Sequence, residues 1–505
     1  MKNLDWISKW AALKPNSTAV TDLETGESFT YRMLDRISTQ ICEYFSETVK
    51  EGDRIGALME HSPYLVALFS ACQRLGAILV PLNYRLSATE IQQQIKDCKP
   101  SVLIYSELFD EAVFFLKDQV ETLRLLDFSE RIRSIDITGA EKNKYHIREE
   151  LPVFLFYTSG TTARPKGVLY TTKMLFWNSL NTSMQLGITS KDKTLNILPP
   201  YHTSGWNIFL TPLLHNGGEI LIQKKIDPSL ILKYLSSKKI TLFMVLPTIL
   251  QMLSKEKDFD ASDLKALRYI ICGGEGITLE QLRIWKEHKN VNIRPGYGLT
   301  EAGPSITSLH EDFCLEKPTS IGKPNFYVEL KVIDSEGKEV AENEIGELCI
   351  RGEVVTPGYW NNSVATRDKI KNEWFHTGDL AMTDEDGFYY LKGRIDDMYI
   401  SGGENIFPHE IENVLKNHPE IVNIQVIPFD DDVWGKKGVV FIKPSGPGLN
   451  KEAVQNFLKD RLAKFKHPKE YIFLEEFPLT GFGKVSRKDL VRIYSQKNSK
   501  KNLNS

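Results

Sequence analysis

A run of hydroxyl groups, glycines and cations at residues 158–167 is the part of the sequence best suited to hold phosphate. It reads Thr-Ser-Gly-Thr-Thr-Ala-Arg-Pro-Lys-Gly and follows a strand-like segment at residues 155–157. Glycines let backbone N–H groups approach an anion, hydroxyls donate to phosphate oxygens, and Lys166 supplies a countercharge. The same composition is typical of an ordinary loop. It is not a Walker-type loop, because Lys166 precedes Gly167 instead of following the second glycine.

Seven further motifs accompany this loop along the chain, at residues 76–83, 296–301, 346–348, 377–380, 393–397, 402–406 and 478–484. Taken singly, each could be a turn or an aromatic anchor. Their shared order, over roughly residues 30 to 490, resembles the adenylate-forming (AMP-binding) superfamily of acyl-CoA synthetases, peptide-synthetase adenylation domains and firefly luciferase. The resemblance implies an ATP-dependent ligase that converts a carboxylic acid to acyl-AMP and pyrophosphate. The acyl group then passes to coenzyme A, and AMP is released.

This chemistry requires a site that holds a tetraanion, a magnesium ion and adenosine, and that stabilises charge on the α-phosphate. By resemblance, Tyr297 would stack on adenine, Thr300 would bind the α-phosphate, and Asp379 would accept both ribose hydroxyls. Mg²⁺ would be held by Glu301 and Thr161, because it prefers oxygen ligands. The resemblance assigns nucleotide binding to Thr158, Ser159, Gly160, Thr161, Thr162, Lys166, Gly274, Glu275, Gly296, Tyr297, Gly298, Asp379 and Arg394.

Two features imply separate geometries for the two half-reactions. Lys484, in the pattern Pro-x-Thr-x-x-Gly-Lys, would move in to meet the α-phosphate and the carboxylate. A lone lysine in such a segment is otherwise a surface residue. By resemblance, Asp396 would be a hinge for rotation of the C-terminal domain, and Gly402 and Gly403 would line the coenzyme A channel. The catalytic candidates are Lys484, Thr300, Glu301 and His202.

The acyl pocket is predicted around His202, Trp206 and Gly273. A tryptophan four residues after this histidine resembles the tunnel gate of long-chain fatty acyl-CoA synthetases, so a fatty acid is the first expectation. Trp206 could equally shorten the pocket for an aryl acid, and an acyl transfer to a carrier protein stays open. No aspartate that could hold a substrate amine occurs between Tyr201 and Phe209, which disfavours amino acids.

Two departures from the family pattern lie at the nucleotide site. Ala163 replaces the usual glycine of the phosphate loop, at a cost of about 1 kcal/mol if that position needs a positive φ. Glu275 places an unexpected charge near the adenine and acyl sites. A luciferase-like monooxygenase or a catalytically inactive nucleotide-binding protein are further alternatives, and the intact set of candidate residues argues against the second.

The composition narrows the functional class and the compartment. The chain has 505 residues and a net charge of −3, which gives no electrostatic reason to expect nucleic acid as a partner. Six scattered cysteines without C-x-x-C spacing indicate a reducing compartment. The N-terminus lacks an apolar signal region, and the longest apolar stretch, 242–253, is too short to span a bilayer. A cytoplasmic monomer or homodimer is therefore expected.

Short apolar runs that alternate with helical stretches predict an α/β fold. We expect a large N-terminal domain of two helix-covered sheets with a β-barrel-like subdomain, and a small mobile α+β C-terminal domain. Buried strands are predicted at 102–105, 196–198, 220–222, 242–245 and 269–271, and a helix after the capping box 87–90. The predicted boundaries are 1–393, a hinge at 394–396, 397–496 and a disordered tail at 497–505.

Overall fold

The computed structural model describes residues 4–114, 116, 118–135, 145–158, 165–273, 277–401, 404–431, 434–459, 461–480 and 485–502. The chain divides into two compact units. The first contains Met1–Leu330 and Ile350–Phe375, and the second contains Lys331–Cys349 and His376–Ser505. The domain and hinge boundaries expected from the sequence stay predictions.

A six-stranded sheet of the first unit has the order β6-β5-β3-β4-β7-β8. All neighbouring pairs are parallel except the last, where β7 and β8 form a hairpin. The predicted capping box opens α4: the Ser87 side chain accepts from the Glu90 backbone N–H, and the Glu90 side chain accepts in return from Ser87. The strands are β3 (Arg54–Leu58), β4 (Ile78–Pro81), β5 (Val102–Tyr105), β6 (Glu121–Arg124), β7 (Pro152–Thr158) and β8 (Lys166–Thr171). The helices are α2 (Tyr31–Phe45), α3 (Pro63–Leu75), α4 (Ala88–Cys98), α5 (Asp110–Phe114) and α6 (Leu125–Ser134).

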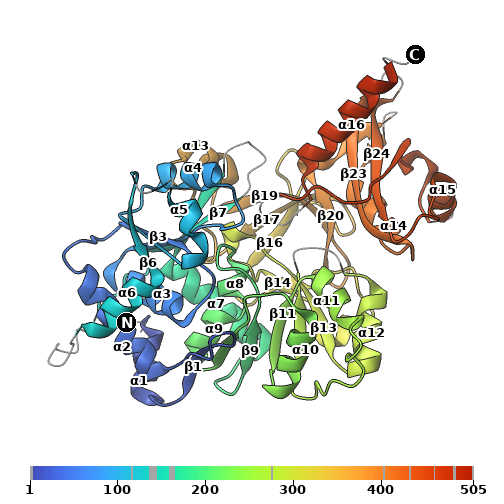
Figure 1. The fold of residues 1–505 in the computed structure, drawn as a ribbon. Helices are drawn as coiled ribbons and strands as arrows, with labels where there is room; N and C mark the ends of the chain where they lie inside the picture. The colour runs from blue at the N-terminus through green and yellow to red at the C-terminus, as the bar shows by residue number, and fades with distance from the viewer. Residues whose placement is uncertain are drawn as a thin grey trace. The chain divides into compact units, whose positions relative to one another are not determined.

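The second sheet of this unit has nine strands in the order β15-β14-β13-β12-β11-β9-β10-β1-β2. The strands from β13 to β1 in this order are parallel. Helices α10, α11 and α12 lie next to one another beside β11 and β13 (Figure 1). The strands are β1 (Thr18–Asp22), β2 (Ser28–Thr30), β9 (Lys193–Asn196), β10 (Glu219–Ile222), β11 (Leu242–Val245), β12 (Tyr269–Cys272), β13 (Asn292–Tyr297), β14 (Thr307–Ser308) and β15 (Lys323–Pro324). The helices are α1 (Trp6–Leu13), α7 (Thr172–Leu186), α8 (Ser204–Asn207), α9 (Leu210–Asn216), α10 (Pro228–Ser237), α11 (Pro247–Ser254) and α12 (Leu279–Lys289).

Four of the five predicted buried strands are confirmed, as β5, β10, β11 and β12. The fifth was placed too late. Strand β9 ends at Asn196, because the Asn196 side chain accepts a hydrogen bond from the Leu198 backbone N–H and turns the chain out of the sheet.

The β-rich region is a five-stranded sheet with the order β16-β17-β19-β18, in which β20 also pairs with β19. Two tight turns in this region have a glycine with positive φ, Gly337 at +83° and Gly387 at +76°. Asp384 closes the second turn by accepting from the backbone N–H groups of Asp386 and Phe388. The strands are β16 (Glu329–Ile333), β17 (Gly346–Arg351), β18 (Ile370–Lys371), β19 (Trp374–Thr383) and β20 (Tyr389–Arg394), and helix α13 is Ser363–Lys369.

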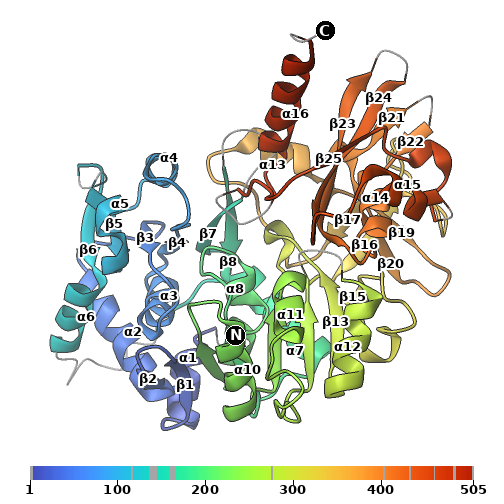
Figure 2. The ribbon, with the colours of Figure 1, turned by 45° about the vertical axis from the view of Figure 1, so that its right-hand side comes forward.

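The C-terminal part of the second unit packs helices against another five-stranded sheet, with the order β22-β21-β24-β23 and β25 beside β24. Its core joins Ile411 and Leu415 of α14 to Val426 and Val440 of the sheet, and α15 lies beside the same sheet (Figure 2). The elements are β21 (Tyr399–Ser401), β22 (Glu404–Ile406), α14 (Pro408–Leu415), β23 (Ile421–Asp431), β24 (Gly435–Pro444), α15 (Lys451–Lys459), β25 (Glu470–Phe473) and α16 (Arg487–Asn502).

Helix α16 runs through Asn502 and therefore into the segment predicted to be a disordered tail. This segment contains no proline or glycine, so it has no strong helix breaker that would end the helix earlier. The expected α/β class, with a smaller α+β part at the C-terminus, is confirmed. Among the described residues, no helix has both the length and the apolar character needed to cross a bilayer.

Candidate active site

The parallel strands of the nine-stranded sheet bring several predicted site residues to one edge. Strands β11, β12 and β13 run parallel, so the segments after their carboxyl ends meet there. Gly273 follows β12, and Gly296 and Tyr297 end β13. A Cβ atom on Gly273 would lie 3.3 Å from the Gly296 carbonyl oxygen. The structure thus places an acyl-pocket candidate directly against a nucleotide candidate.

The loop after β13 is folded tightly enough to require glycine. A Cβ atom on Gly298 would lie 2.3 Å from the carbonyl carbon and oxygen of Pro304, a distance that no side chain tolerates. The Tyr297 carbonyl accepts from the Ile306 N–H at 2.9 Å, which closes the loop. Between these points a single 3₁₀ turn, η2 (Thr300–Ala302), presents Thr300 and Glu301, both half-buried.

The ends of the predicted phosphate loop are held together by the β7–β8 hairpin. Thr158 pairs with Lys166 across the hairpin, and the Thr158 hydroxyl donates to the Lys166 carbonyl at 3.4 Å. The candidates Ser159, Gly160, Thr161 and Thr162 lie outside the described residues, as does Ala163. The hairpin therefore positions Lys166, a half-buried residue, at the start of β8.

Tyr359 is a further candidate site residue, which the sequence analysis did not single out. Its hydroxyl donates to Glu301 Oε1 at 2.9 Å, and Lys166 Nζ lies 5.4 Å from the centroid of its ring. Tyr359 is only 7% exposed. It therefore contacts both the predicted magnesium ligand and the predicted phosphate-binding lysine. Its sequence context, Gly-Tyr-Trp in a loop, carries no chemical signal that could have singled it out.

The two aromatic candidates of the acyl pocket have different surroundings. His202 is half-buried, with its ring 4.7 Å from that of Tyr201. Trp206 has no exposed surface and packs against Phe154 and Phe69, with ring centroids at 4.9 and 5.6 Å. Its indole N–H donates to the Pro200 carbonyl at 2.8 Å. Trp206 is thus part of the hydrophobic core of the first unit, and its predicted lining of the acyl pocket stays a prediction.

A small cavity lies beside this segment, lined by Gly205, Phe209 and Met244 among others. Its volume is about 10 Å³, room for one water molecule at most. A Cβ atom on Gly205 would lie 2.4 Å from the Pro199 carbonyl oxygen, so the glycine is needed for this close packing.

The ribose-binding candidates belong to the second unit, where they face each other on adjacent strands. Asp379 of β19 pairs with Arg394 of β20, and Arg394 Nη1 lies 2.8 Å from Asp379 Oδ1. The turn before Asp379 is anchored by Glu347, whose Oε1 accepts from the Gly378 N–H at 2.9 Å. The Thr377 hydroxyl donates to the Leu348 carbonyl at 2.7 Å. The motif at residues 346–348 therefore holds the turn that presents Asp379.

Glu347 also bonds His376 Nδ1 at 2.9 Å, and Cys349 Sγ lies 3.7 Å from the same nitrogen. These three side chains have ligand atoms within 4.8 Å of one another and could hold a metal ion. Glu347 and His376 already bond each other, and Glu347 also holds Gly378, so the simplest role of the group is to fix the Asp379 turn.

The remaining candidates are the predicted hinge, the predicted coenzyme A channel, two nucleotide-binding candidates and the predicted catalytic lysine. The Asp396 backbone lies in the 3₁₀ turn η4 (Ile395–Asp397), and the neighbouring Asp397 forms an ion pair with Arg487 of α16. Gly274, Glu275, Gly402, Gly403 and Lys484 lie outside the described residues.

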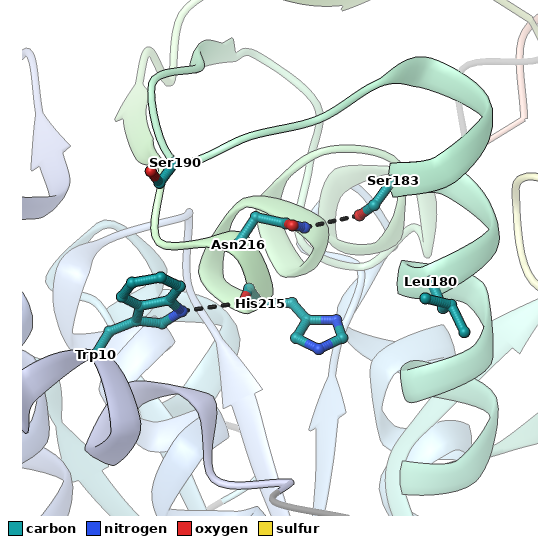
Figure 3. Close-up of a pocket in the computed structure, with 6 residues that line it drawn as sticks. All are labelled: Trp10, Leu180, Ser183, Ser190, His215 and Asn216. Atoms are coloured by element: carbon teal, nitrogen blue, oxygen red, sulfur yellow. Dashed lines mark hydrogen bonds between the residues drawn. The ribbon is translucent and has the colours of Figure 1, made fainter. Parts of the chain in front are cut away.

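A pocket of about 320 Å³ elsewhere in the first unit contains none of the predicted site residues. Figure 3 shows it between α1, α7 and α9, where Trp10 Nε1 donates to the His215 carbonyl at 2.9 Å and Asn216 donates to Ser183 at 2.8 Å. His215 stacks on Trp6 at 4.2 Å, and burial lowers its pKa to about 4. Internal hydrogen bonds and ring stacking thus explain how these side chains are held in place.

Comparisons with known proteins match nearly the whole chain. The AMP-binding enzyme family matches residues 7–360, and the AMP-binding enzyme C-terminal domain matches residues 410–484. A feruloyl-CoA synthase of Amycolatopsis sp is 32% identical over 97% of this chain and 98% of its own length. An indoleacetate–CoA ligase of Aromatoleum aromaticum is 31% identical over 98% of this chain and 99% of its own length.

Solved structures agree in fold. The o-succinylbenzoate CoA synthetase of Bacillus subtilis, in complex with ATP and magnesium ion, superimposes with a TM-score of 0.87 at 28% identity and covers 96% of this chain and 98% of its own. A Mycobacterium tuberculosis fatty acyl CoA synthetase has a TM-score of 0.80 at 27% identity, and the match covers 98% of this chain and 99% of the other. The chain therefore belongs to the AMP-binding enzyme family and is an acid–thiol ligase.

Proposed function

We propose that this enzyme activates an aryl-substituted carboxylic acid as its adenylate and transfers the acyl group to coenzyme A. The sequence interpretation placed a fatty acid first. The relatives named above support its alternative better, because the feruloyl and indoleacetyl groups in their names are aromatic and the matches cover nearly the whole chain.

The observation that carries this choice is the burial of Trp206. A residue that gates a lipid tunnel must move, whereas the Trp206 indole is fully buried and hydrogen-bonded to Pro200. This burial supports a short, rigid acyl pocket, which suits a planar acid better than a long flexible one.

The first half-reaction follows from the residues of the first unit. A carboxylate oxygen of the acid attacks the α-phosphorus of ATP, and the bond to the β-phosphate oxygen breaks with release of pyrophosphate. Lys166 and the loop that precedes it would hold the leaving phosphates, and Thr300 would donate to the α-phosphate. Tyr297, at the end of β13, would stack on the adenine.

Magnesium fits the donors present, because the Glu301 carboxylate is a hard oxygen ligand on a rigid turn. When bound, the ion neutralises charge on the transferred phosphate groups. The Tyr359 hydroxyl donates to one oxygen of this carboxylate, and the two oxygens of a carboxylate together offer about four acceptor sites. Thr161 is the second proposed ligand.

In the second unit, Asp379 would accept the ribose hydroxyls, held in place by Arg394 and by the Glu347-anchored turn. Lys484 would stabilise the α-phosphate and the attacking carboxylate. Rotation about Asp396 would then admit coenzyme A past Gly402 and Gly403. Its sulfur attacks the acyl carbon, AMP leaves, and the thiol proton goes to solvent. All six cysteines lie among the described residues, are buried and form no disulfide, which supports the proposed cytoplasmic location.

The test is release of pyrophosphate and AMP from ATP and Mg²⁺ over a panel of cinnamic, arylacetic, medium-chain and long-chain acids, with and without coenzyme A. We expect AMP release that needs both an aryl acid and coenzyme A. A higher kcat/KM for fatty acids than for every aryl acid would refute the proposed substrate class. Pyrophosphate release without any response to coenzyme A would refute the proposed acceptor and indicate a carrier protein.

A further inference from the structure

Residues 356–360, which we call the strap, run alongside β8 as an additional extended segment. The Trp360 N–H donates to the Gly167 carbonyl at 2.7 Å, and the Leu169 N–H donates to the Gly358 carbonyl at 3.1 Å. An antiparallel β-bridge joins Val168 to the central residue of the strap. The strap is therefore fixed to the strand that begins with Lys166.

The same strap is also fixed to the turn that carries Glu301. The Thr356 N–H donates to the Glu301 backbone carbonyl at 2.7 Å, and the Tyr359 hydroxyl donates to Glu301 Oε1 at 2.9 Å. The Tyr359 ring in turn faces Lys166 Nζ at 5.4 Å. One tyrosine thus offers its ring to a cation and its hydroxyl to an anion, and its backbone N–H is held by the Thr366 hydroxyl at 3.0 Å.

We propose that Tyr359 is a positioning residue that orients Glu301 for Mg²⁺ and Lys166 for the phosphates of ATP before either ligand arrives. The inference rests on the proposed function, which assigns Glu301 to the metal and Lys166 to the phosphates. Tyr359 itself touches neither reactant in this scheme. It acts through the two charged side chains that it contacts.

The physical reason is the opposite charge of the two groups. A lysine and a glutamate that both reach into a partly buried site attract each other, and an ion pair between them would have to be broken for MgATP to bind. A tyrosine can contact both charged groups and hold them less tightly than they would hold each other. The reason is that a cation over an aromatic ring and a hydroxyl on a carboxylate are weaker contacts than a direct ion pair. The magnesium ion and the phosphates can then add to these contacts without first separating two charges.

The test measures metal binding separately from turnover. Binding of Mn²⁺ to the enzyme with ATP but without acid is followed by electron paramagnetic resonance, and Mg²⁺ is titrated in the pyrophosphate-release assay. Tyr359→Phe removes the hydroxyl and should weaken Mn²⁺ binding about 10-fold, as expected for one hydrogen bond to a charged group. The KM for the acid should stay within about 2-fold, since the substitution leaves the acyl site untouched. Tyr359→Leu also removes the ring and should weaken ATP binding a further few-fold.

Two controls keep the outcomes distinct. Tyr31→Phe removes another buried hydroxyl, which donates to the Gly218 carbonyl at 2.8 Å in the core, and should leave Mn²⁺ binding unchanged. Glu301→Gln tests the proposed function itself and should weaken Mn²⁺ binding more than Tyr359→Phe does. If Glu301→Gln weakens it and Tyr359→Phe leaves it within 2-fold of wild type, the positioning role of Tyr359 is overturned. If Glu301→Gln has no effect, the metal assignment in the proposed function fails, and the role of Tyr359 fails with it.

Discussion

Replacing Trp206 decides whether this residue supports the core or shapes the acyl pocket. Its side chain has no exposed surface, so Trp206→Ala creates a large cavity at a cost of about 3–5 kcal/mol. The buried Pro200 carbonyl also loses its donor, which adds about 1–3 kcal/mol. Native proteins have only about 5–15 kcal/mol of stability, so the alanine variant should be marginally folded.

Trp206→Phe is the more informative change, because it keeps an aromatic ring and removes the indole N–H. We expect a loss of about 1–3 kcal/mol, mainly from the unpaired Pro200 carbonyl. If the free energy of unfolding falls by about 3 kcal/mol per molar urea, this loss lowers the urea midpoint of unfolding by about 0.3–1 M. Urea unfolding followed by far-UV circular dichroism measures this shift, since the circular dichroism signal does not depend on the replaced indole.

Trp285→Phe is the matched control. Trp285 is 1% exposed in another core cluster of the first unit, and its indole nitrogen has no hydrogen-bond partner among the described residues. Trp285→Phe therefore changes ring size without breaking a hydrogen bond. The reasoning is refuted if Trp206→Phe leaves the urea midpoint unchanged and shifts the kcat/KM ratio towards long-chain acids by more than about 10-fold, about 1.4 kcal/mol. In that case Trp206 lines the pocket.

Three further perturbations test other parts of the enzyme. Lys484→Ala should slow adenylation at least about 10²-fold, the usual loss for one transition-state donor, and normal pyrophosphate exchange would contradict its assigned role. Asp396→Pro should spare adenylation and block thioester formation, because proline restricts φ at the proposed hinge, whereas equal loss of both half-reactions would argue against a hinge. His215 has a pKa lowered to about 4 by burial, so it is neutral when folded and takes up a proton on unfolding below its unfolded pKa of about 6.5. Stability should therefore fall by about 2 kcal/mol between pH 7 and pH 5, and His215→Phe should remove that part of the pH dependence in urea titrations at the two pH values.

Local chemistry made much of the fold predictable from the sequence. Strands β10, β11 and β12 are short apolar runs buried on both faces, and α4 begins at a complete capping box. The β9 strand was placed too late, because residues 196–198 look as strand-like as their neighbours until the Asn196 side chain is seen to bond Leu198. Apolar periodicity reports burial and does not report where a side-chain hydrogen bond turns the chain.

The sequence points to candidate site residues where a residue type is tied to a task, and it does not assign a role where the surroundings of a side chain decide it. The Asp379 turn and the Gly298 loop come from motifs whose order is specific. Trp206 shows the limit, since a tryptophan beside a predicted acyl pocket can face the acid or the core with the same sequence pattern. Its packing against Phe69 and Phe154 is visible only in the structure.

Tyr359 was beyond sequence reasoning for a topological reason. It lies 58 residues after Glu301 and 193 residues after Lys166 along the chain. Neither separation matches a helical or strand period, so no local pattern could join the three. The sheet topology does so by laying the strap against β8. The two charged side chains that the proposed reaction needs are therefore coupled by a segment with no charge of its own, and a variant search confined to the recognisable motifs would miss it.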